Sequence, residues 1–380
     1  MKTVDIEIWR STEEIEANRG VWEDLFRSSE CSPYLGYDWF LTSLKYFPCG
    51  NRLRVGLLKV NYQPMAIVPL EFSREKTGPL THTILQFALD GWALRNGAIV
   101  KDGFDELYAM REVVNSLRRT EPHWTYCCLS KYPEYSPTKQ EKDQGESGAI
   151  RTDAVLFGHS VVIEIPESWE EYRKTLSRAH RSNISRRSNT MGRKGNIKMC
   201  RLGLDSNCDS HELKELMNDA VLVCKNSWQN TVAGGWAISD PKTGGFFLEV
   251  SEKLATKGML DLSVLYLDKQ PISFLWGAAR GLHTTINKLG YDQSFSELSP
   301  GLVHLAKHIE DSIERGMKSI DFGHEFFDYK SSWGKRYDPL VTLFLYPPGI
   351  LPSFIRWMRS RRLAPGPSNG IFQHKTCQSV

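Results

Sequence analysis

The chain has 380 residues, which is enough for two domains of ordinary size. Its formal net charge is +3, and the excess lies in residues 351–380, so the rest of the chain is near neutral and lacks the charge of a general nucleic-acid binder. With 41% hydrophobic and 24% charged residues, and no apolar run near the roughly 18 residues of a membrane span, we expect a globular protein without a transmembrane segment.

The first 160 residues have the pattern of one α/β lobe. A short strand over residues 4–9 precedes a helix in which Ser11 and Glu14 fit a capping box. Alternation and turn residues then predict a hairpin, a strand, a helix and a strand, over residues 53–72, 84–88, 104–119 and 125–129. This half has no glycine-rich phosphate loop, so we expect it to form one wall of an acceptor cleft. Residues 131–150 are polar, and we interpret them as a lid over that cleft or as a plain insertion.

The second half begins with a strand at 161–165 and a long helix opened by residues 166–168 and ended by Gly192 and Gly195. Between residues 173 and 194 this helix carries eight cations and no acid: Arg173, Lys174, Arg178, Arg181, Arg186, Arg187, Arg193 and Lys194. Such an unmixed run indicates an anionic partner, which could be the phosphates of coenzyme A, an acyl-carrier protein or tRNA. The alternative is a solvated helix face.

Three strands between residues 262 and 289 read as an antiparallel meander, and a helix follows them. Ser299 is expected to be its N-cap, with Pro300 in its first turn and Gly316 after its end. The free N–H groups of such a helix start, next to Ser299 and Gly301, are suited to a phosphate. The alternative is an ordinary capped helix. A strand at 319–322 and a polar loop with Lys330 come next.

His304 and His308 have the spacing of two metal ligands on one helix. We expect them to lie opposite the apolar face of this helix. No third ligand is marked nearby in the sequence, so we predict no metal site.

Five motifs occur in a recognisable order: Arg181-Ser182-Asn183-Ile184-Ser185-Arg186-Arg187, Ser299-Pro300-Gly301, Arg315-Gly316, Asp321-Phe322-Gly323 and Tyr329-Lys330-Ser331-Ser332-Trp333-Gly334. Together they resemble the GNAT-like acyltransferases found beside bacterial exopolysaccharide and cellulose operons. The chain is also similar, more distantly, to the Fem family of peptidoglycan aminoacyltransferases. The resemblance covers residues 30–347, more weakly on the N-terminal side.

This resemblance implies an α/β (α+β) fold of two tandem GNAT-like lobes with mixed, mainly antiparallel sheets. The N-terminal, acceptor-side lobe would span residues 1–160, the acyltransferase lobe residues 161–347 and a basic tail residues 348–380. It also implies that the aromatic segment at residues 31–40 packs beside the acceptor cleft, although plain core packing is the alternative.

The implied activity is transfer of an acyl group, acetyl first among them, from acyl-CoA or an acyl-carrier protein to an amine. The acceptor would be a small molecule or a glycan or lipid precursor in exopolysaccharide or cell-envelope biosynthesis. No tightly bound cofactor is expected. Eight cysteines without a CxxC pair favour reduced thiols and a cytoplasmic location.

The resemblance suggests Lys330, Asp321 and Tyr329 as catalytic residues, because the matching lysine of Fem relatives stabilises the oxyanion or contacts phosphate. The donor would be bound by Arg181, Arg186, Arg187, Ser299 and Gly301. The general base stays open among Asp321, His324, Glu325 and Asp328. For each of the acids the alternative is a loop carboxylate that caps a backbone N–H.

Two other functions fit the same residues. One is a Fem-like aminoacyl-tRNA-dependent ligase, with the basic helix as the tRNA contact. The other is a non-catalytic accessory protein of a polysaccharide synthase. In the tail, residues 354–358 form a short basic amphipathic piece, which either touches a membrane or a synthase or is a frayed end.

Overall fold

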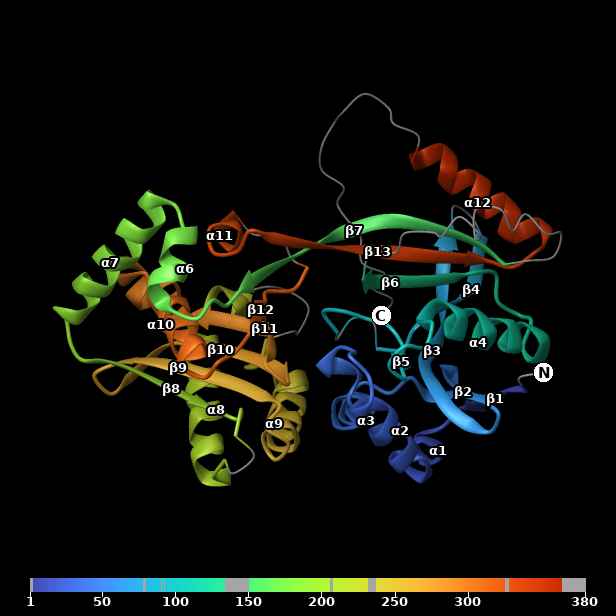
Figure 1. Ribbon diagram of the computed structural model, residues 1–380, viewed down its shortest axis with the longest axis horizontal. Helices are drawn as coiled ribbons and strands as arrows, with labels where there is room; N and C mark the ends of the chain where they lie inside the picture. Colours follow the sequence, from blue (N-terminus) through green and yellow to red (C-terminus); the bar gives the residue numbers. More distant parts are fainter. Residues whose placement is uncertain are drawn as a thin grey trace.

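The computed structural model describes residues 3–77, 80–89, 91, 93–133, 150–205, 208–231, 237–324 and 328–363. One sheet runs through the whole molecule, and helices cover it in two halves that are bridged by the long strands β7 and β13 (Figure 1). The fold is therefore mixed α/β, with most strand pairs antiparallel.

The first half contains β1 (Val4–Trp9), α1 (Thr12–Ala17), α2 (Arg19–Arg27), η1 (Pro33–Leu35), α3 (Tyr37–Tyr46), η2 (Gly50–Arg52), β2 (Leu53–Val60), β3 (Gln63–Thr77), β4 (Leu80–Phe87), β5 (Ile99–Val100), α4 (Glu106–Thr120) and β6 (Cys127–Pro133). The predicted capping box is present, because the Ser11 hydroxyl accepts from the Glu14 N–H while the Glu14 carboxylate accepts from the Ser11 N–H. The predicted hairpin is β2 and β3.

The second half contains β7 (Arg151–Glu164), α6 (Trp169–Thr175), α7 (Arg178–Gly192), β8 (Ile197–Leu202), α8 (Ser210–Lys225), η3 (Trp228–Thr231), α9 (Pro241–Ala255), β9 (Leu260–Leu267), β10 (Gln270–Arg280), β11 (His283–Tyr291), η4 (Gln293–Leu298), α10 (Pro300–Glu314), β12 (Ser319–Asp321), α11 (Asp328–Ser331) and β13 (Arg336–Tyr346). Helix α12 (Ile350–Leu363) follows. The predicted meander is β9, β10 and β11.

The long basic helix of the prediction is wrong, since it is two helices, α6 and α7. Leu176 has an extended backbone at φ −80° and ψ 152°, which ends α6. The Ser177 hydroxyl then accepts from the His180 N–H at 3.1 Å and caps α7. A serine hydroxyl that satisfies a free N–H stabilises a helix start, so the chain begins a new helix at this point.

Each half repeats one strand pattern. In the first half β1, β2, β3 and β4 are antiparallel neighbours and β6 is parallel to β4. In the second half β8, β9, β10 and β11 are antiparallel neighbours and β12 is parallel to β11. A helix lies between the two parallel strands in both cases, α4 in the first half and α10 in the second.

The two halves exchange their last strands. Strand β7 follows β6 along the chain but pairs with β12, whereas β13 follows β12 but pairs with β6. The two exchanged strands also pair with each other, from Arg336 with Val162 to Tyr346 with Arg151. The two predicted sheets are thus one continuous sheet, and the proposed boundary at residue 160 falls inside β7.

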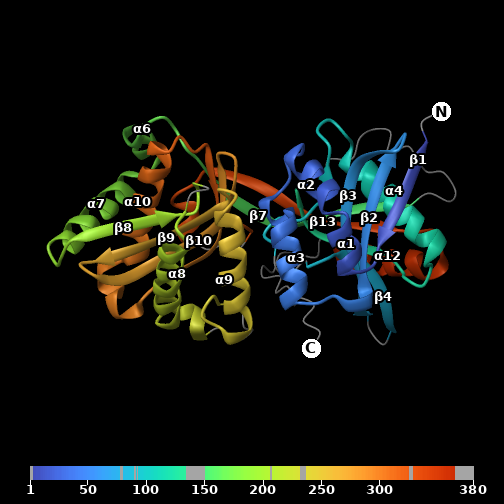
Figure 2. The same cartoon turned by 90° about the horizontal axis from the view of Figure 1, so that it is seen from below.

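A shared hydrophobic core joins the halves where α3 packs on α9 (Figure 2). The ring of Trp39 lies 5.1 Å from that of Phe246 and 5.9 Å from that of Trp276. Lys45 pairs with Glu249 at 2.6 Å along the same contact. The walls of any site between the halves are consequently held in place by packing as well as by the sheet.

Candidate functional site

The parallel strands β11 and β12 pair over only three residues. His283 faces Ser319, Thr284 faces Ile320 and Thr285 faces Asp321. Strand β12 then ends, while β11 continues to Tyr291. From residue 286 onward, β11 has no β12 partner, and the Leu289 carbonyl accepts from Gln229 Nε2 at 2.5 Å.

A pocket of about 610 Å³ lies between the two halves beside this paired stretch. Its walls come from the first half, including Cys31, Arg95 and Glu106, and from the strands of the second half, including Thr285, Asp321 and Asp338. The predicted aromatic segment contributes here, because Ser32 and Pro33 line the pocket while Tyr34 and Trp39 lie in the shared core.

Asp321 lies in the wall of this pocket and is fully engaged. Its Oδ2 accepts from Arg95 Nε at 2.6 Å, and its Oδ1 accepts from the Ser160 hydroxyl and, at 2.8 Å, from the Gly323 N–H. Arg95 also binds Asp338 at 3.0 Å through Nη2. Three donors on one carboxylate make Asp321 an anchor that orients Arg95 across the pocket.

Glu106 is the acid that sequence reasoning missed. It lies in the first turn of α4, and its Oε1 accepts from the Ala98 N–H at 2.6 Å. Burial raises the pKa of Glu106 to about 7, although bonds from Ala98 and Tyr132 oppose that shift. In the sequence it is only one of the acids typical of a helix start, and nothing local predicts that residues 95–98 cover it.

Lys330 is 4% exposed and donates to the Phe322 carbonyl at 2.7 Å, directly after β12 ends. Tyr329, its neighbour in α11, is exposed. Burial and the charges of Lys131 and Lys330 lower the pKa of His324 to about 3. His324 is therefore neutral and a weak proton acceptor. Glu325 and the side chain of Asp328 lie outside the described residues.

The three predicted donor-binding arginines of α7 differ in their contacts. Arg181 Nη1 donates to the carbonyls of Arg173 at 3.1 Å and Leu176 at 2.7 Å, so it closes the end of α6. Arg187 Nη1 donates to the Glu297 carbonyl at 2.7 Å, two residues before Ser299. Arg186 is exposed, with Asn183 as a partner on its own helix. Of these contacts, only that of Arg187 reaches the segment that precedes α10.

The start of α10 departs from the prediction in one respect. Ser299 occupies the N-cap position, but its backbone is left-handed at φ 53° and its hydroxyl makes no capping bond. Its carbonyl instead accepts from the N–H groups of Leu302 at 3.1 Å and Val303 at 3.3 Å. Since Pro300 has no N–H, Gly301 carries the first-turn N–H that is left for a ligand. A Cβ added to Gly301 would meet Tyr291 at an ordinary 3.5 Å.

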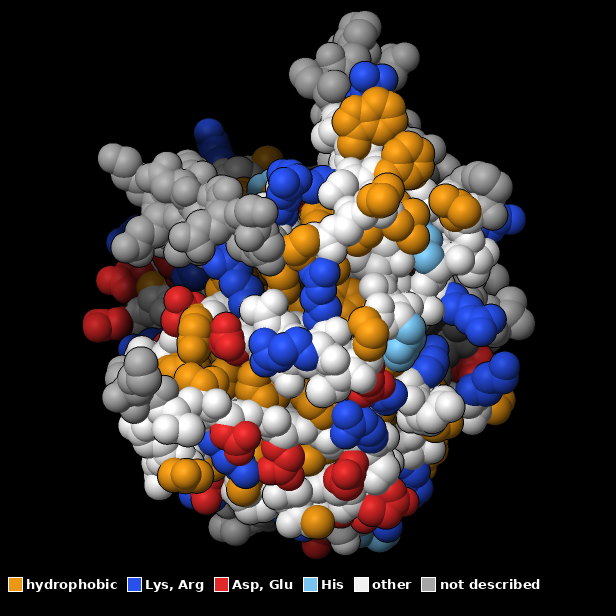
Figure 3. All heavy atoms as spheres, turned by 90° about the vertical axis from the view of Figure 1, so that its right-hand side faces the viewer, with side chains coloured by type: hydrophobic (Ala, Val, Ile, Leu, Met, Phe, Trp, Pro, Cys, Tyr) orange, Lys and Arg blue, Asp and Glu red, His pale blue; other side chains and the backbone are white. Residues whose placement is uncertain are grey.

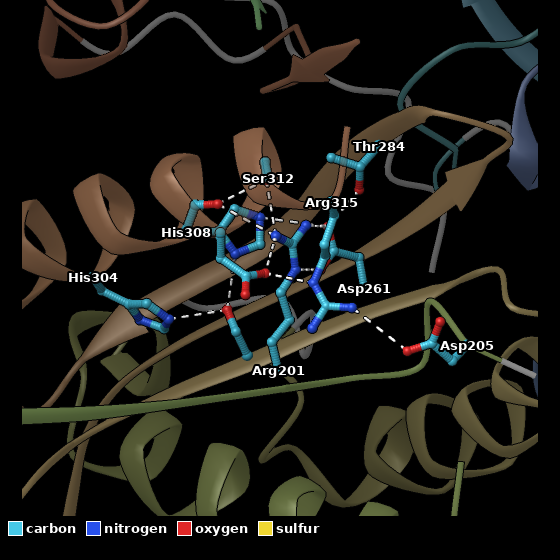
Figure 4. Close-up of polar contacts among 10 residues, drawn as sticks. Arg201, Asp205, Asp261, Thr284, His304, His308, Ser312 and Arg315 are labelled. Carbon is cyan, nitrogen blue, oxygen red and sulfur yellow. Dashed lines mark hydrogen bonds and ion pairs between the residues drawn. The ribbon is translucent and has the colours of Figure 1, made fainter. Parts of the chain in front are cut away.

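His304 and His308 are buried, so their predicted place opposite the apolar face is wrong. They join a polar network under the sheet (Figure 4). Ser263 Oγ lies 2.9 Å from His304 Nε2 and 3.1 Å from His308 Nδ1, and Ser273 Oγ lies 3.0 Å from His304 Nδ1. Burial lowers the pKa of both imidazoles. They are neutral core residues whose partners come from strands β9 and β10.

The same network contains a buried ion pair. Arg201 binds both oxygens of Asp261 at 2.8 Å and reaches Asp311, also at 2.8 Å. Thr284, which lines the pocket, donates to Asp261 at 2.7 Å. Within the described part of the chain, no cluster of three His, Cys, Asp or Glu side chains is arranged to hold a metal ion. Because Thr284 belongs to β11 and donates to Asp261, the buried network holds β11 in place.

Residues 178–331 match the model of a family described as an acetyltransferase (GNAT) domain. This stretch runs from α7 to α11 and includes the short parallel pair of β11 and β12. The fold is of the GNAT type. Its two tandem GNAT-like lobes and mainly antiparallel strands confirm the predicted fold class, with a single sheet in place of two.

Solved structures share this fold over nearly the whole chain. The crystal structure of FemX has a TM-score of 0.57 at 12% identity, covering 93% of this chain and 99% of that chain. The C-terminal domain of a putative lysylphosphatidylglycerol synthetase from Agrobacterium fabrum has 0.55 at 11%, covering 95% and 99%. L-PGS from Bacillus licheniformis has 0.50 at 11%, covering 92% and 96%. No curated protein matches the sequence.

Among the helices of the described ranges, none has the length and apolar character that a membrane span requires. The GNAT-type domain carries the general expectation of an acyl donor and an amine acceptor.

Proposed function

We propose that this protein is an N-acyltransferase that moves an acyl group from a coenzyme A thioester, acetyl-CoA first among them, to an amine held in the pocket between the lobes. The observation that carries the proposal is the three-residue pairing of β11 with β12, inside the stretch that matches the acetyltransferase (GNAT) domain. The pantetheine arm would bond to the unpaired edge of β11, and the thioester would lie near Asp321 and Lys330.

In this reaction the amine nitrogen attacks the thioester carbonyl carbon, the C–N bond forms, the C–S bond breaks and the thiol leaves. The attacking nitrogen must lose one proton, and the carbonyl oxygen must be stabilised while it carries negative charge. We assign the oxyanion to Lys330 and a donor contact to Tyr329. Asp321 and Arg95 would orient the acceptor amine, because they cross the pocket wall as a rigid pair.

We further propose Glu106 as the proton acceptor, since it lines the pocket and a pKa of about 7 suits a base at neutral pH. Glu106→Gln should lower kcat by about 100-fold. It should also abolish the rise of kcat/KM with pH near 7, because that rise reports deprotonation of this carboxyl group. The measurement is the pH–rate profile of thiol release.

Glu30→Gln is the matched control for this change, because Glu30 lines the same pocket but is exposed. Glu30→Gln should keep the wild-type kcat and the wild-type pH–rate profile. If Glu106→Gln retains the ascending limb near pH 7, another group takes the proton.

The donor phosphates are proposed to meet the Gly301 N–H, with Arg186 and Arg187 beside it. Gly301→Val should weaken the binding of coenzyme A by about tenfold, or about 1.4 kcal/mol, because its branched side chain blocks the approach to the backbone. Its melting temperature should stay nearly unchanged, since a Cβ fits there. Calorimetric titration with coenzyme A measures the affinity, and Gly301→Ala is the milder control. Normal binding by folded Gly301→Val would remove the phosphate site from α10.

Exposure of the freshly purified protein to acyl-CoA, acyl-carrier protein and aminoacyl-tRNA, followed by native mass spectrometry, tests the donor class. Thiol release is then measured with amino sugars, amino acids and amine-bearing lipid precursors as acceptors. Binding and turnover with acyl-CoA support the proposal, whereas turnover with the carrier protein alone would keep the acyl transfer but overturn coenzyme A as the donor. We also propose that the protein acts in the cytoplasm, in exopolysaccharide or cell-envelope synthesis. The acceptor that is turned over would show which of these two pathways it serves.

The second candidate is aminoacyl transfer from tRNA, as in the Fem family. It is favoured by the similarity to FemX over 93% of the chain and by the basic α7. Its mark would be an affinity for aminoacyl-tRNA that falls steeply with salt, without thiol release from acyl-CoA. A protein without any transfer activity, but required by a polysaccharide synthase, would instead be a non-catalytic accessory subunit.

A further inference from the structure

Helix α12 is fixed to the sheet by one face. Ile355 is fully buried, and it packs with Tyr126 and Tyr346. Arg356 binds Asp153 through two bonds of 2.8 Å. Arg359 reaches Glu75 at 3.0 Å. The predicted amphipathic piece at residues 354–358 is thus part of a docked helix and not a frayed end.

The opposite face of α12 carries a strip of exposed apolar side chains, which we call the α12 strip: Ile350, Leu351, Phe354 and Trp357. Their exposed fractions are 93%, 40%, 44% and 48% in that order. The rings of Phe354 and Trp357 stack with centroids 6.0 Å apart. On the face shown in Figure 3, hydrophobic side chains gather along the upper projection, with Lys and Arg side chains beside them. The helical spacing places Ile350, Phe354 and Trp357 on one face, with Leu351 at the edge of that face toward Met358.

The charged side chains of α12 itself are of one sign. The helix contains Arg356, Arg359, Arg361 and Arg362 and no acid. Asp153 and Glu75, from strands β7 and β3, are paired with Arg356 and Arg359. The Cζ atom of Arg361 lies 4.1 Å from the centroid of the Trp357 ring. Among the described residues, Arg361 forms no ion pair. On α4, Arg119 is exposed and Arg118 donates to the Pro348 carbonyl at the start of α12.

This combination distinguishes between possible occupants. A second copy of the chain, paired through the same strip, would bring two helices of like charge together. A purely apolar protein groove would leave Arg361 without a partner. An anionic lipid surface suits both the apolar side chains and the arginines. Tryptophan and phenylalanine enter the headgroup boundary, while arginines contact the lipid phosphates.

We propose that α12 is an interfacial anchor that docks the protein reversibly on an anionic membrane surface through the α12 strip and its flanking arginines. The helix lies in the plane of the surface and does not enter the bilayer core, since its inner face is held by the sheet. This proposal is independent of the transferase chemistry.

The test is co-sedimentation of the full chain with vesicles of phosphatidylcholine alone and of phosphatidylcholine mixed with phosphatidylglycerol. The wild type should bind the mixed vesicles, and its bound fraction should fall with added salt. Changing all four strip residues to serine should lower the partition coefficient at least about tenfold, since most of the inserted apolar surface is lost. Arg361→Gln should weaken binding to the mixed vesicles only.

The matched control changes four exposed side chains elsewhere to serine: Tyr62, Leu222, Leu248 and Leu282. It should bind vesicles as the wild type does. Unchanged vesicle binding by the strip variant, or no binding by the wild type, overturns the proposal. A wild-type dimer in sedimentation velocity that only the strip variant dissociates would also overturn it and assign the strip to a second copy of this chain.

Discussion

Replacing Lys330 with alanine should lower the turnover of acyl transfer by about 100- to 1,000-fold, the usual loss when one donor to a developing oxyanion is removed. The lysine lies where β12 ends and where the thioester is proposed to lie, and its ammonium already contacts the Phe322 carbonyl. Steady-state kinetics with the acyl donor that proves active measure the loss. KM for the donor should change far less than kcat, because the oxyanion exists only in the transition state.

The contact with Phe322 means that Lys330→Ala also removes a buried hydrogen bond, which costs about 1–3 kcal/mol of stability. Lys330→Met keeps most of the side-chain volume and separates the charge from the packing. Lys318→Met, which changes an exposed lysine in the wall of the pocket between the halves, is the control and should stay active. Near wild-type turnover in folded Lys330→Met would exclude the proposed role.

Asp261→Asn should lower the free energy of unfolding by about 3–5 kcal/mol, because it leaves the buried Arg201 without its main counter-charge. Burial alone would raise the pKa of Asp261, but Arg201 and His308 hold it well below its usual value. Denaturant titration followed by fluorescence measures the loss. Asp24→Asn, in an exposed pair with Arg27, should leave the unfolding midpoint nearly unchanged. A similarly small effect of Asp261→Asn would mean that the network does not support β11.

The same network predicts acid sensitivity. His304 and His308 are neutral when folded, with lowered pKa values, so only the unfolded chain binds their protons below about pH 6.5. The free energy of unfolding should have its full value above that pH. Below it, the free energy should fall by up to about 1.4 kcal/mol per pH unit for each histidine. Asp261 adds to the loss in the same direction at lower pH, because its ionised form is favoured by folding.

Much of the fold could be predicted from the sequence because its signals are local. The alternation in β9 and β10 and the capping box at Ser11 depend on near neighbours in the chain, and both are present in the structure. The order of the motifs was sufficient to predict a GNAT-type fold. The exchange of β7 and β13 could not be predicted, since a strand pattern does not specify which strand will be its neighbour.

The candidate site could be predicted only in part, because some of its residues depend on partners that are distant in the sequence. Asp321 and Lys330 lie where the motifs suggested, beside the end of β12. Glu106 gains its raised pKa from burial by a segment of the other wall, which helix periodicity does not reveal. His304 was placed on the wrong face because its partners, Ser263 and Ser273, are supplied by distant strands.

The exchanged strands also determine how this chain can fold during synthesis. Strand β6 is completed early, but its neighbour β13 lies about half the chain length away, with Leu343 beside Leu129. Until β13 leaves the ribosome, the first lobe exposes an open strand edge, which is a common start of aggregation. Because such distant pairings slow folding, this chain should depend on chaperones that hold the first lobe. Either lobe expressed alone should be insoluble, whereas co-expression of residues 1–164 with residues 165–380 should restore both.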